Sequence, residues 1–312
     1  MDIMDIYNIS DIVKLKVDRR LPFYSRQILS KAGIPAKETE PLPYSLTIRQ
    51  GFSDFPLPGG WLSFDLCRMA ENAVEWRARH KFSRWKYRLY RLDAASWQLE
   101  IKGDFFSQWI WPHQLAGAIL RLLLWRGGLM QIPTAGVFSG IRAVLLLSSP
   151  ETEKFLDKFL ESCSDKVHYD KMTTWKDGSL IPSRRSTRSR SLNSGLSFPA
   201  AGNLPKGQPS SVPIGGMIVL RRGSSFSKIY DAEKTAFANR ITGDLEIYDL
   251  PLLRIAEMET LTGFSVLGAE DYLSSCRASV GKLLENVPIT VLELPPDFSM
   301  EQIETLKKEI LS

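Results

Sequence analysis

Cysteine is scarce in this sequence, with three residues among 312: Cys67, Cys163 and Cys276. Their odd number and wide spacing exclude a disulfide framework and indicate reduced thiols. Long apolar runs are missing too, because Arg121 interrupts the longest apolar helical stretch, residues 115–125, which is too short to span a bilayer. The N-terminus carries early acidic residues and no cleavable apolar core, so no signal peptide is expected. These absences predict a soluble, cytoplasmic chain with no membrane association.

Histidine is equally sparse. His80, His113 and His168 lie far apart and lack any spacing typical of metal ligands, so no metal site is expected. A large excess of one charge is also absent: 40 basic and 35 acidic residues leave a net charge of +5, a milder balance than most nucleic-acid-binding domains show. The hydrophobic share of 44% suits a globular protein, and the length allows one large or two modest domains.

What is present centres on residues 141–162, IRAVLLLSSPETEKFLDKFLES. The apolar run Ala143–Leu147 predicts a strand buried inside a sheet. A helix is expected directly after it, with Ser149 as N-cap, Pro150 at the first helical position and acidic residues in the first turn. Its apolar residues recur at helical spacing and predict one buried stripe: Phe155, Leu156, Phe159 and Leu160.

A strand, a tight turn and a helix form the frame in which phosphate-binding loops occur. The pattern G-x-x-x-x-G-K-[ST] aligns with Ser148, Glu153, Lys154 and Phe155, so only the lysine is kept. The missing glycines would let backbone amides curl around phosphate, and Phe155 cannot replace the hydroxyl that holds magnesium. With Ser149 capping the helix, no ordinary ATP binding and no cofactor are expected here.

The rest of the chain divides into regions that differ in their predicted secondary structure. Residues 1–110 read as a β-rich region, and residues 111–312 as an α/β domain that begins with a helix over 112–125. A strand pair is expected around the turn Lys176-Asp177-Gly178, and Ser299-Met300-Glu301-Gln302 predicts a capping box before the last helix. Residues 183–211 are rich in serine, arginine, proline and glycine and predict a mobile loop. Its four arginines (184, 185, 188 and 190) suit either a solvated loop or a grip on phosphate or an acidic peptide.

The aromatic segment between residues 76 and 101 has two interpretations. In the first, its rings form the core of a β-sheet, and arginine and lysine stems cover them. In the second, rings and cations together form a stacking surface for nucleic-acid bases. The first is preferred, because alternation alone produces this pattern in a half-buried sheet. The rings are Trp76, Phe82, Trp85, Tyr87, Tyr90 and Trp97, and the cations are Arg77, Arg79, Lys81, Arg84, Lys86 and Arg88.

Across residues 125–300 the succession of strands resembles the HPr kinase-like family, whose fold is related to phosphoenolpyruvate carboxykinase. The segments that carry the resemblance are LMQIPTAGV, FSGI, RAVLLL, SSPETEKF, YDKM, VPIGGMIVLRRG and NVPITVLELPPD. The resemblance implies an α/β domain of the P-loop type. The sequence is similar to a divergent branch of this family found in peptide-modification cassettes, the SynChlorMet cassette proteins. This similarity implies an accessory role in maturing a ribosomally made peptide.

The departures from the family fall on its chemistry. Pro133 lies near the place of an expected histidine, the loop keeps only Lys154, and Lys171 follows Asp170 where the family has a second acid. Three hypotheses follow. The first is a non-catalytic binding protein with a protein or peptide partner, such as a peptide or enzyme of a modification cassette. The second is a divergent ATP- and magnesium-dependent serine kinase using Lys154 and Asp170, and the third is a basic nucleic-acid-binding protein.

Overall fold

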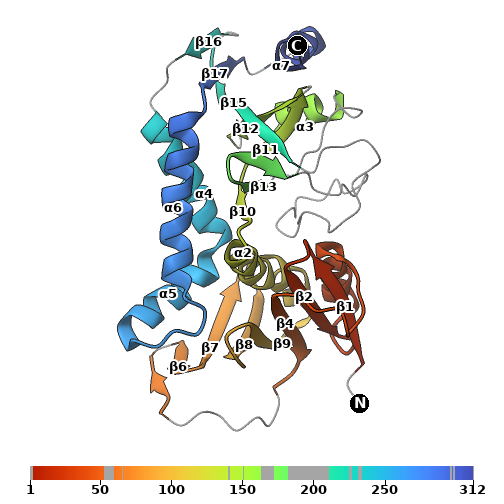
Figure 1. The fold of residues 1–312 in the computed structure, drawn as a ribbon, viewed down its shortest axis with the longest axis vertical. Coiled ribbons are helices and arrows are strands. Elements are labelled where there is room, and N and C mark those ends of the chain that lie inside the picture. The colour runs from red at the N-terminus through yellow and green to blue at the C-terminus, as the bar shows by residue number, and fades with distance from the viewer. Residues whose placement is uncertain are drawn as a thin grey trace. The chain divides into compact units, whose positions relative to one another are not determined.

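The structure, a computed structural model, is of mixed α/β class. It describes residues 3–52, 60–64, 66–139, 141–149, 151–162, 172–181, 211–224, 227–230, 234–295, 297 and 299–311. Within these ranges lie seven α-helices and two large sheets (Figure 1). The described residues form two compact units. Unit 1 contains those of 3–128 and 246–275, and unit 2 contains those of 129–245 and 276–311. The predicted domain boundary near residue 110 stays a prediction, because compact units need not be separately folding domains.

A nine-stranded sheet dominates unit 1, in the order β3-β1-β2-β4-β9-β8-β7-β6-β5. Strands β2, β4 and β9 run parallel, whereas β6 to β9 form an antiparallel meander. This confirms that the N-terminal region is rich in β-structure. The strands are β1 (Met4–Ile9), β2 (Val13–Asp18), β3 (Ile34–Pro35), β4 (Tyr44–Gln50), β5 (Leu62–Ser63), β6 (Cys67–Ala70), β7 (Ala73–His80), β8 (Ser83–Arg91) and β9 (Ser96–Gly103).

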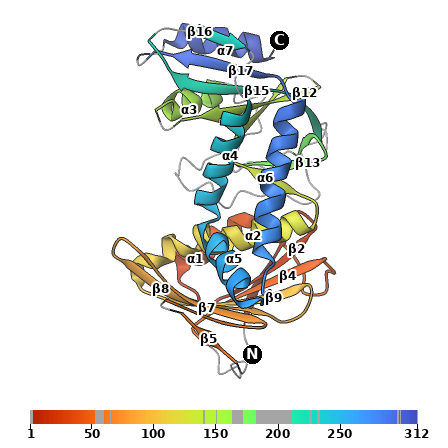
Figure 2. The same cartoon turned by 90° about the vertical axis from the view of Figure 1, so that its left-hand side faces the viewer.

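Helices cover one face of this sheet (Figure 2). They are α1 (Phe23–Leu29), α2 (Gly117–Arg126) and α5 (Leu250–Thr262), with 3₁₀ turns at Ser30–Ala32 and Phe105–Trp109. The helix expected over 112–125 is present, but its first turn, Pro112–Ala116, is π-helical. Under the helices the strands bury alternate apolar side chains, as the period of a half-buried strand requires: Trp85, Tyr87, Leu89, Trp97, Leu99 and Ile101.

In unit 2, strand β12 (Arg142–Ser148) lies between antiparallel β11 (Ala135–Ser139) and parallel β15 (Val212–Arg222). The prediction that Ala143–Leu147 form an interior strand is therefore confirmed. Strand β15 also pairs in parallel with β17 (Ile289–Leu294), which pairs with β16 (Ser227–Tyr230). The sheet is completed by β10 (Met130–Ile132), β13 (Thr173–Lys176) and β14 (Ser179–Ile181).

A predicted hairpin turn and a predicted capping box of unit 2 are also confirmed. Strands β13 and β14 form a hairpin whose turn residues Asp177 and Gly178 have φ angles of 48° and 78°, as a tight hairpin turn requires. At the start of α7 (Met300–Leu311) the Ser299 backbone N–H donates to Gln302 Oε1 (2.8 Å). The Gln302 N–H in turn donates to Ser299 Oγ (3.2 Å), which completes the capping box.

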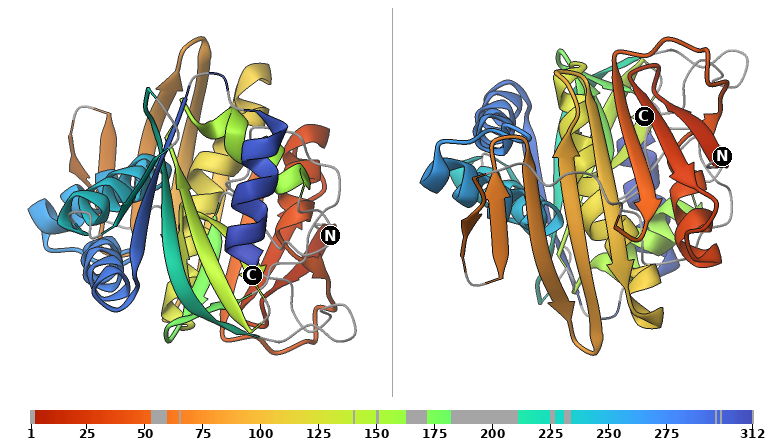
Figure 3. Two further views of the ribbon diagram at one scale, coloured as in Figure 1. Left: turned by 90° about the horizontal axis from the view of Figure 1, so that it is seen from above. Right: turned by 90° about the horizontal axis from the view of Figure 1, so that it is seen from below.

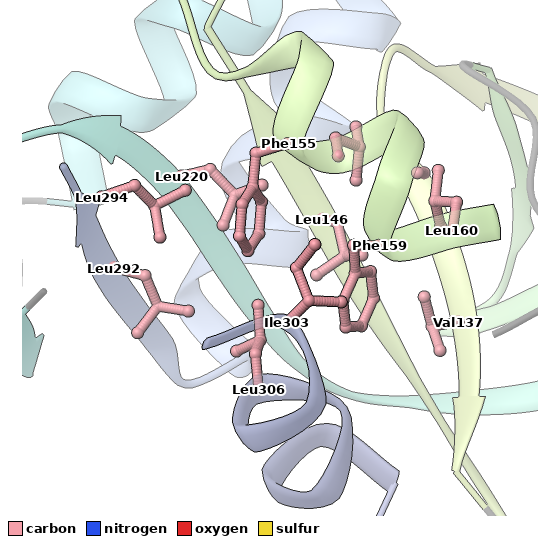
Figure 4. Packing of buried hydrophobic residues seen from close by; sticks show 12 residues of the cluster. Val137, Leu146, Phe155, Phe159, Leu160, Leu220, Leu292, Leu294, Ile303 and Leu306 are labelled. Atoms are coloured by element: carbon pink, nitrogen blue, oxygen red, sulfur yellow. The ribbon is translucent and has the colours of Figure 1, made fainter. Parts of the chain in front are cut away.

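Helices α3 (Glu153–Ser162) and α7 lie on one face of the unit 2 sheet (Figure 3, left). Helices α4 (Lys234–Tyr248) and α6 (Ala269–Asn286) each contribute residues to both units. A cluster of buried apolar residues lies between α3, α7 and the sheet (Figure 4). It contains the predicted stripe Phe155, Leu156, Phe159 and Leu160, each at most 4% exposed. None of the helices in the described ranges is long and apolar enough to cross a membrane.

Candidate functional site

The carboxyl ends of the parallel strands β12, β15 and β17 are the first place to look for a site. In open α/β sheets, ligands bind in the crevice beyond these ends, where loops lead into helices. The connection from β12 to α3 is residues 149–152, of which Pro150 lies outside the described residues. The strand, turn and helix expected from the sequence are therefore present at the expected place.

Thr152 closes this turn. The Ser149 backbone N–H donates to Thr152 Oγ1 (2.9 Å), and the Thr152 N–H donates to the Ser149 carbonyl (2.9 Å). The Thr152 hydroxyl, in a residue that is 3% exposed, also lies 3.2 Å from the carbonyl oxygen of Leu220 in β15. The turn is thus attached to the neighbouring strand, and the Ser149 N–H is bonded within the protein rather than available to a phosphate.

The predicted role of Ser149 is wrong. The helix begins at Glu153, not at Pro150, so the residue before its first turn is Thr152. The carbonyl of Thr152 accepts the N–H groups of Phe155 (3.1 Å) and Leu156 (3.0 Å). Thr152 is held at this position by the contact of its hydroxyl with the Leu220 carbonyl and by its hydrogen bonds to Ser149. The sequence signal was a threonine directly before Glu-Lys-Phe-Leu, but its partner lies 68 residues away.

Phe155 occupies the place where a phosphate-binding loop has its metal-binding hydroxyl. The residue is 1% exposed, and its ring is stacked on that of Phe159, with centroids 6.5 Å apart (Figure 4). Glu153, in the first turn, places negative charge where the helix dipole favours an anion. Lys154 is exposed. The four aligned positions therefore offer one exposed cation, one carboxylate and one core ring, with Ser148 ending the strand.

Arg240 is a functional candidate that the sequence analysis missed. From α4 it donates through Nη2 to the Ser148 carbonyl oxygen (2.6 Å), at the carboxyl end of β12. Burial raises the pKa of Asp244, one turn further along α4, and the positive charge of Arg240 partly opposes this. On β15, Arg221 pairs with Glu293 of β17. No sequence motif marks Arg240, because its partner is a backbone carbonyl 92 residues away.

No family model matches the chain, and no curated protein or solved structure is significantly similar to it. Asp170 and Lys171 lie outside the described residues, as do the four arginines of the predicted loop, so these expectations stay predictions. Within the described ranges, no three or more His, Cys, Asp or Glu side chains are grouped to hold a metal ion.

Unit 1 contains a second polar region, on the sheet face opposite the helices. Five charged residues of alternating sign follow one another across five adjacent strands, in register: Arg68, Glu75, Arg88, Glu100 and Arg49. We call this set the charge row. Its two carboxylates are almost fully buried, Glu75 at 4% and Glu100 at 0% exposure. The sequence could not reveal this row, because it depends on the register of strands that are distant in the chain.

Glu75, the second residue of the charge row, contacts three cations. Its carboxylate accepts Arg68 Nη2 (2.6 Å) and Arg88 Nε (2.5 Å), and Lys86 Nζ lies 2.7 Å away. Burial acts to raise the pKa of Glu75, but the hydrogen bonds from Lys86, Arg68 and Arg88 outweigh it and lower the pKa to about 2. The carboxylate is therefore charged at any physiological pH.

The aromatic segment is separated into two faces by this sheet. Trp85, Tyr87, Tyr90 and Trp97 are buried, at most 7% exposed. Of the six rings, Phe82 stands out at 89% exposure, in the β7–β8 turn. Along β8 the cations Arg84, Lys86 and Arg88 alternate with Trp85 and Tyr87 and therefore point to the opposite face. Tyr90 is buried on the same face as these cations. The preferred interpretation, rings in a sheet core, agrees with this burial.

Proposed function

We propose that this chain is a non-catalytic binding protein on an HPr kinase-like scaffold, acting as an accessory protein in peptide modification. The observation that carries the proposal is the closed turn between β12 and α3. Thr152 bonds this turn to itself and to Leu220, and Phe155 is a core residue. A chain whose phosphate-binding turn has become part of the packing retains the scaffold for binding other molecules.

Phosphoryl transfer depends on positioning and on charge, with few covalent steps for the protein to perform. It needs backbone amides and a lysine around the phosphates, and a hydroxyl and an acid on the magnesium ion. At this turn the Ser149 amide is bonded to Thr152, and a phenylalanine takes the position of the hydroxyl. Lys154 alone cannot supply this set, which favours a binding role over catalysis.

The divergent kinase is the second candidate, and one observation favours it. The Arg240 guanidinium lies at the carboxyl end of β12, so the surroundings of this strand end include a cation besides the exposed Lys154 of α3. In that case Asp170 would supply the acid that holds magnesium. Because the turn contains no glycine, side chains rather than backbone amides would then have to hold the nucleotide.

The experiment that separates these candidates is a thermal melt with ATP and magnesium. A ligand at about 100 times its dissociation constant adds about 2.7 kcal/mol to the folded state, so an intact nucleotide site would raise Tm clearly. We expect no shift at millimolar ATP, either in the native chain or in Lys154→Ala. The matched control is Lys158→Ala, one turn further along the same exposed face of α3. A magnesium-dependent shift that disappears in Lys154→Ala but persists in Lys158→Ala would establish the kinase instead.

A further inference from the structure

The face of the unit 1 sheet opposite the helices is strongly cationic near the β7–β8 turn. In Figure 3 (right) the strands of unit 1 lie in front of α2, so the view is of this face. Directly opposed residues on neighbouring strands share a face of the sheet. Arg77 of β7 opposes Lys86 of β8, which opposes Lys102 of β9. Next to them Arg79 opposes Arg84, so two neighbouring rows contain five cations. We call these residues the cationic cluster.

Like charges directly opposite each other destabilise a sheet. The charge row beside the cluster avoids this cost by alternating its signs. The cluster does not: Arg77, Arg79, Arg84 and Lys102 are exposed, and none forms an ion pair within the described part of the chain. Lys86 alone has an acidic partner, Glu75. Among the described residues, the cluster therefore carries an excess of positive charge.

The neighbouring carboxylate of Asp104 offsets only part of the positive charge of the cluster. Asp104 follows β9 directly, and its side chain accepts the backbone N–H groups of Arg84 (2.7 Å) and Ser107 (2.8 Å). It therefore fixes the 3₁₀ turn after β9 rather than pairing with a guanidinium. A surface with four exposed cations, none of which forms an ion pair among the described residues, is complementary to a negatively charged partner.

We propose that the cationic cluster binds an extended acidic segment of a partner peptide or protein. Along one strand, cations two residues apart are separated by roughly 6.5–7 Å, which is also the spacing of alternate side chains in an extended peptide. A segment with acidic residues at every second position therefore matches the cluster in charge and in spacing. The proposal deepens the proposed function, on which its choice of a peptide partner rests.

Single-stranded nucleic acid is the competing polyanion. Proteins that bind it combine a basic groove with exposed rings on which bases stack. Here Trp85 and Tyr87 alternate with the cations along β8, but both are buried on the opposite face. Phe82 in the turn is exposed, and the Phe52 ring is covered by Arg88, whose guanidinium carbon lies 4.2 Å from its centroid. Two further rings belong to this face: Tyr90 is buried, and the guanidinium carbon of Arg68 lies over the Trp61 ring, 5.6 Å from its centroid. Among the described residues, the rings near the cations are thus mostly buried or covered by guanidinium groups rather than free for stacking, which favours the acidic peptide.

The test is fluorescence anisotropy with a labelled peptide of alternating Glu and Thr. We expect Arg77→Glu/Lys102→Glu to weaken binding by about tenfold or more at low salt, because the affinity is electrostatic. A matched control, Lys282→Glu/Lys308→Glu, changes two exposed lysines of unit 2 and alters the net charge equally. It should bind nearly as the native chain does. The neutral variant Arg77→Gln/Lys102→Gln should lose less affinity, and circular dichroism melts verify that each variant folds.

Three results would overturn the proposal: no binding of the peptide at low salt, equal loss in the control variant, or tighter binding of an oligothymidine of equal charge. Tighter binding of the oligothymidine would indicate that the cluster binds nucleic acid instead. A peptide of alternating Gln and Thr should not bind. The result is independent of the nucleotide melt: an ATP-dependent Tm shift rejects the proposed function, whereas failure of the peptide alone rejects this inference.

Discussion

Polar and charged residues have different roles in the two sheets of this protein. In unit 2, the segment with the strongest resemblance to a chemical motif is used for packing: Phe155 lies in an apolar core and Thr152 fixes the turn. In unit 1, the segment that reads as ordinary sheet core carries a buried charge row and an exposed cationic cluster. The comparison shows that a strand–turn–helix frame can be held by packing residues, while a charged surface can arise from strand register that no sequence motif marks.

The largest effect should come from the core of unit 2. Phe155→Ala removes a buried ring and leaves a cavity, which costs about 3–5 kcal/mol of unfolding free energy. The neighbouring Lys154→Ala is exposed and should change stability by about 0.5 kcal/mol or less. Urea denaturation of both variants measures the contrast. A loss below about 1 kcal/mol in Phe155→Ala would show that this position is not structural and would reopen the turn as a site.

The second effect concerns a buried ion pair on the helical side of unit 1. Arg121 donates to Asp249 (Nε to Oδ1, 2.8 Å), both residues are 1% exposed, and the Tyr272 hydroxyl donates to Asp249 Oδ2 (2.7 Å). Removing one partner leaves a buried charge, so Asp249→Ala should cost about 3 kcal/mol. The double variant Arg121→Met/Asp249→Leu should be closer to the native stability in the same urea assay. Equal losses in the two variants would contradict an ion-pair origin.

The third effect is the pH dependence of the charge row. The pKa of Glu75 is lowered to about 2, below the usual value of 4.5, so the unfolded chain binds its proton first as the pH falls. The resulting stabilisation is complete above about pH 4.5 and is lost between about pH 4.5 and 2, at most about 3 kcal/mol. Glu75→Gln should flatten the stability profile in this window, while Glu257→Gln, an exposed acid, leaves it unchanged. Identical profiles for the native chain and Glu75→Gln would show that protonation of Glu75 does not contribute to the pH dependence of the stability.

Local signals account for the features that were predicted correctly. The apolar run at Ala143–Leu147, the turn at Asp177-Gly178 and the pair Ser299/Gln302 each depend on residues close in sequence. The missed features depend on distant partners. Thr152 needs Leu220 and Arg240 needs Ser148, and the charge row needs the register of five strands. Amphipathic patterns show which residues point to the same face, but not which residues of other strands they meet there.

The order of the chain has a consequence for synthesis on the ribosome. Unit 1 needs residues 246–275, for example to place the Val266 carbonyl that accepts the Trp97 indole N–H (2.9 Å). Unit 2 needs β17, which pairs with β15 about 70 residues earlier. Neither unit is therefore complete when the polypeptide has emerged only to residue 245. The sheet of unit 1 lies within residues 4–103, but the helical part of this unit is incomplete until residues 246–275 have emerged, and the sheet of unit 2 still lacks β17 at that point. No single cut of the chain separates the two units intact.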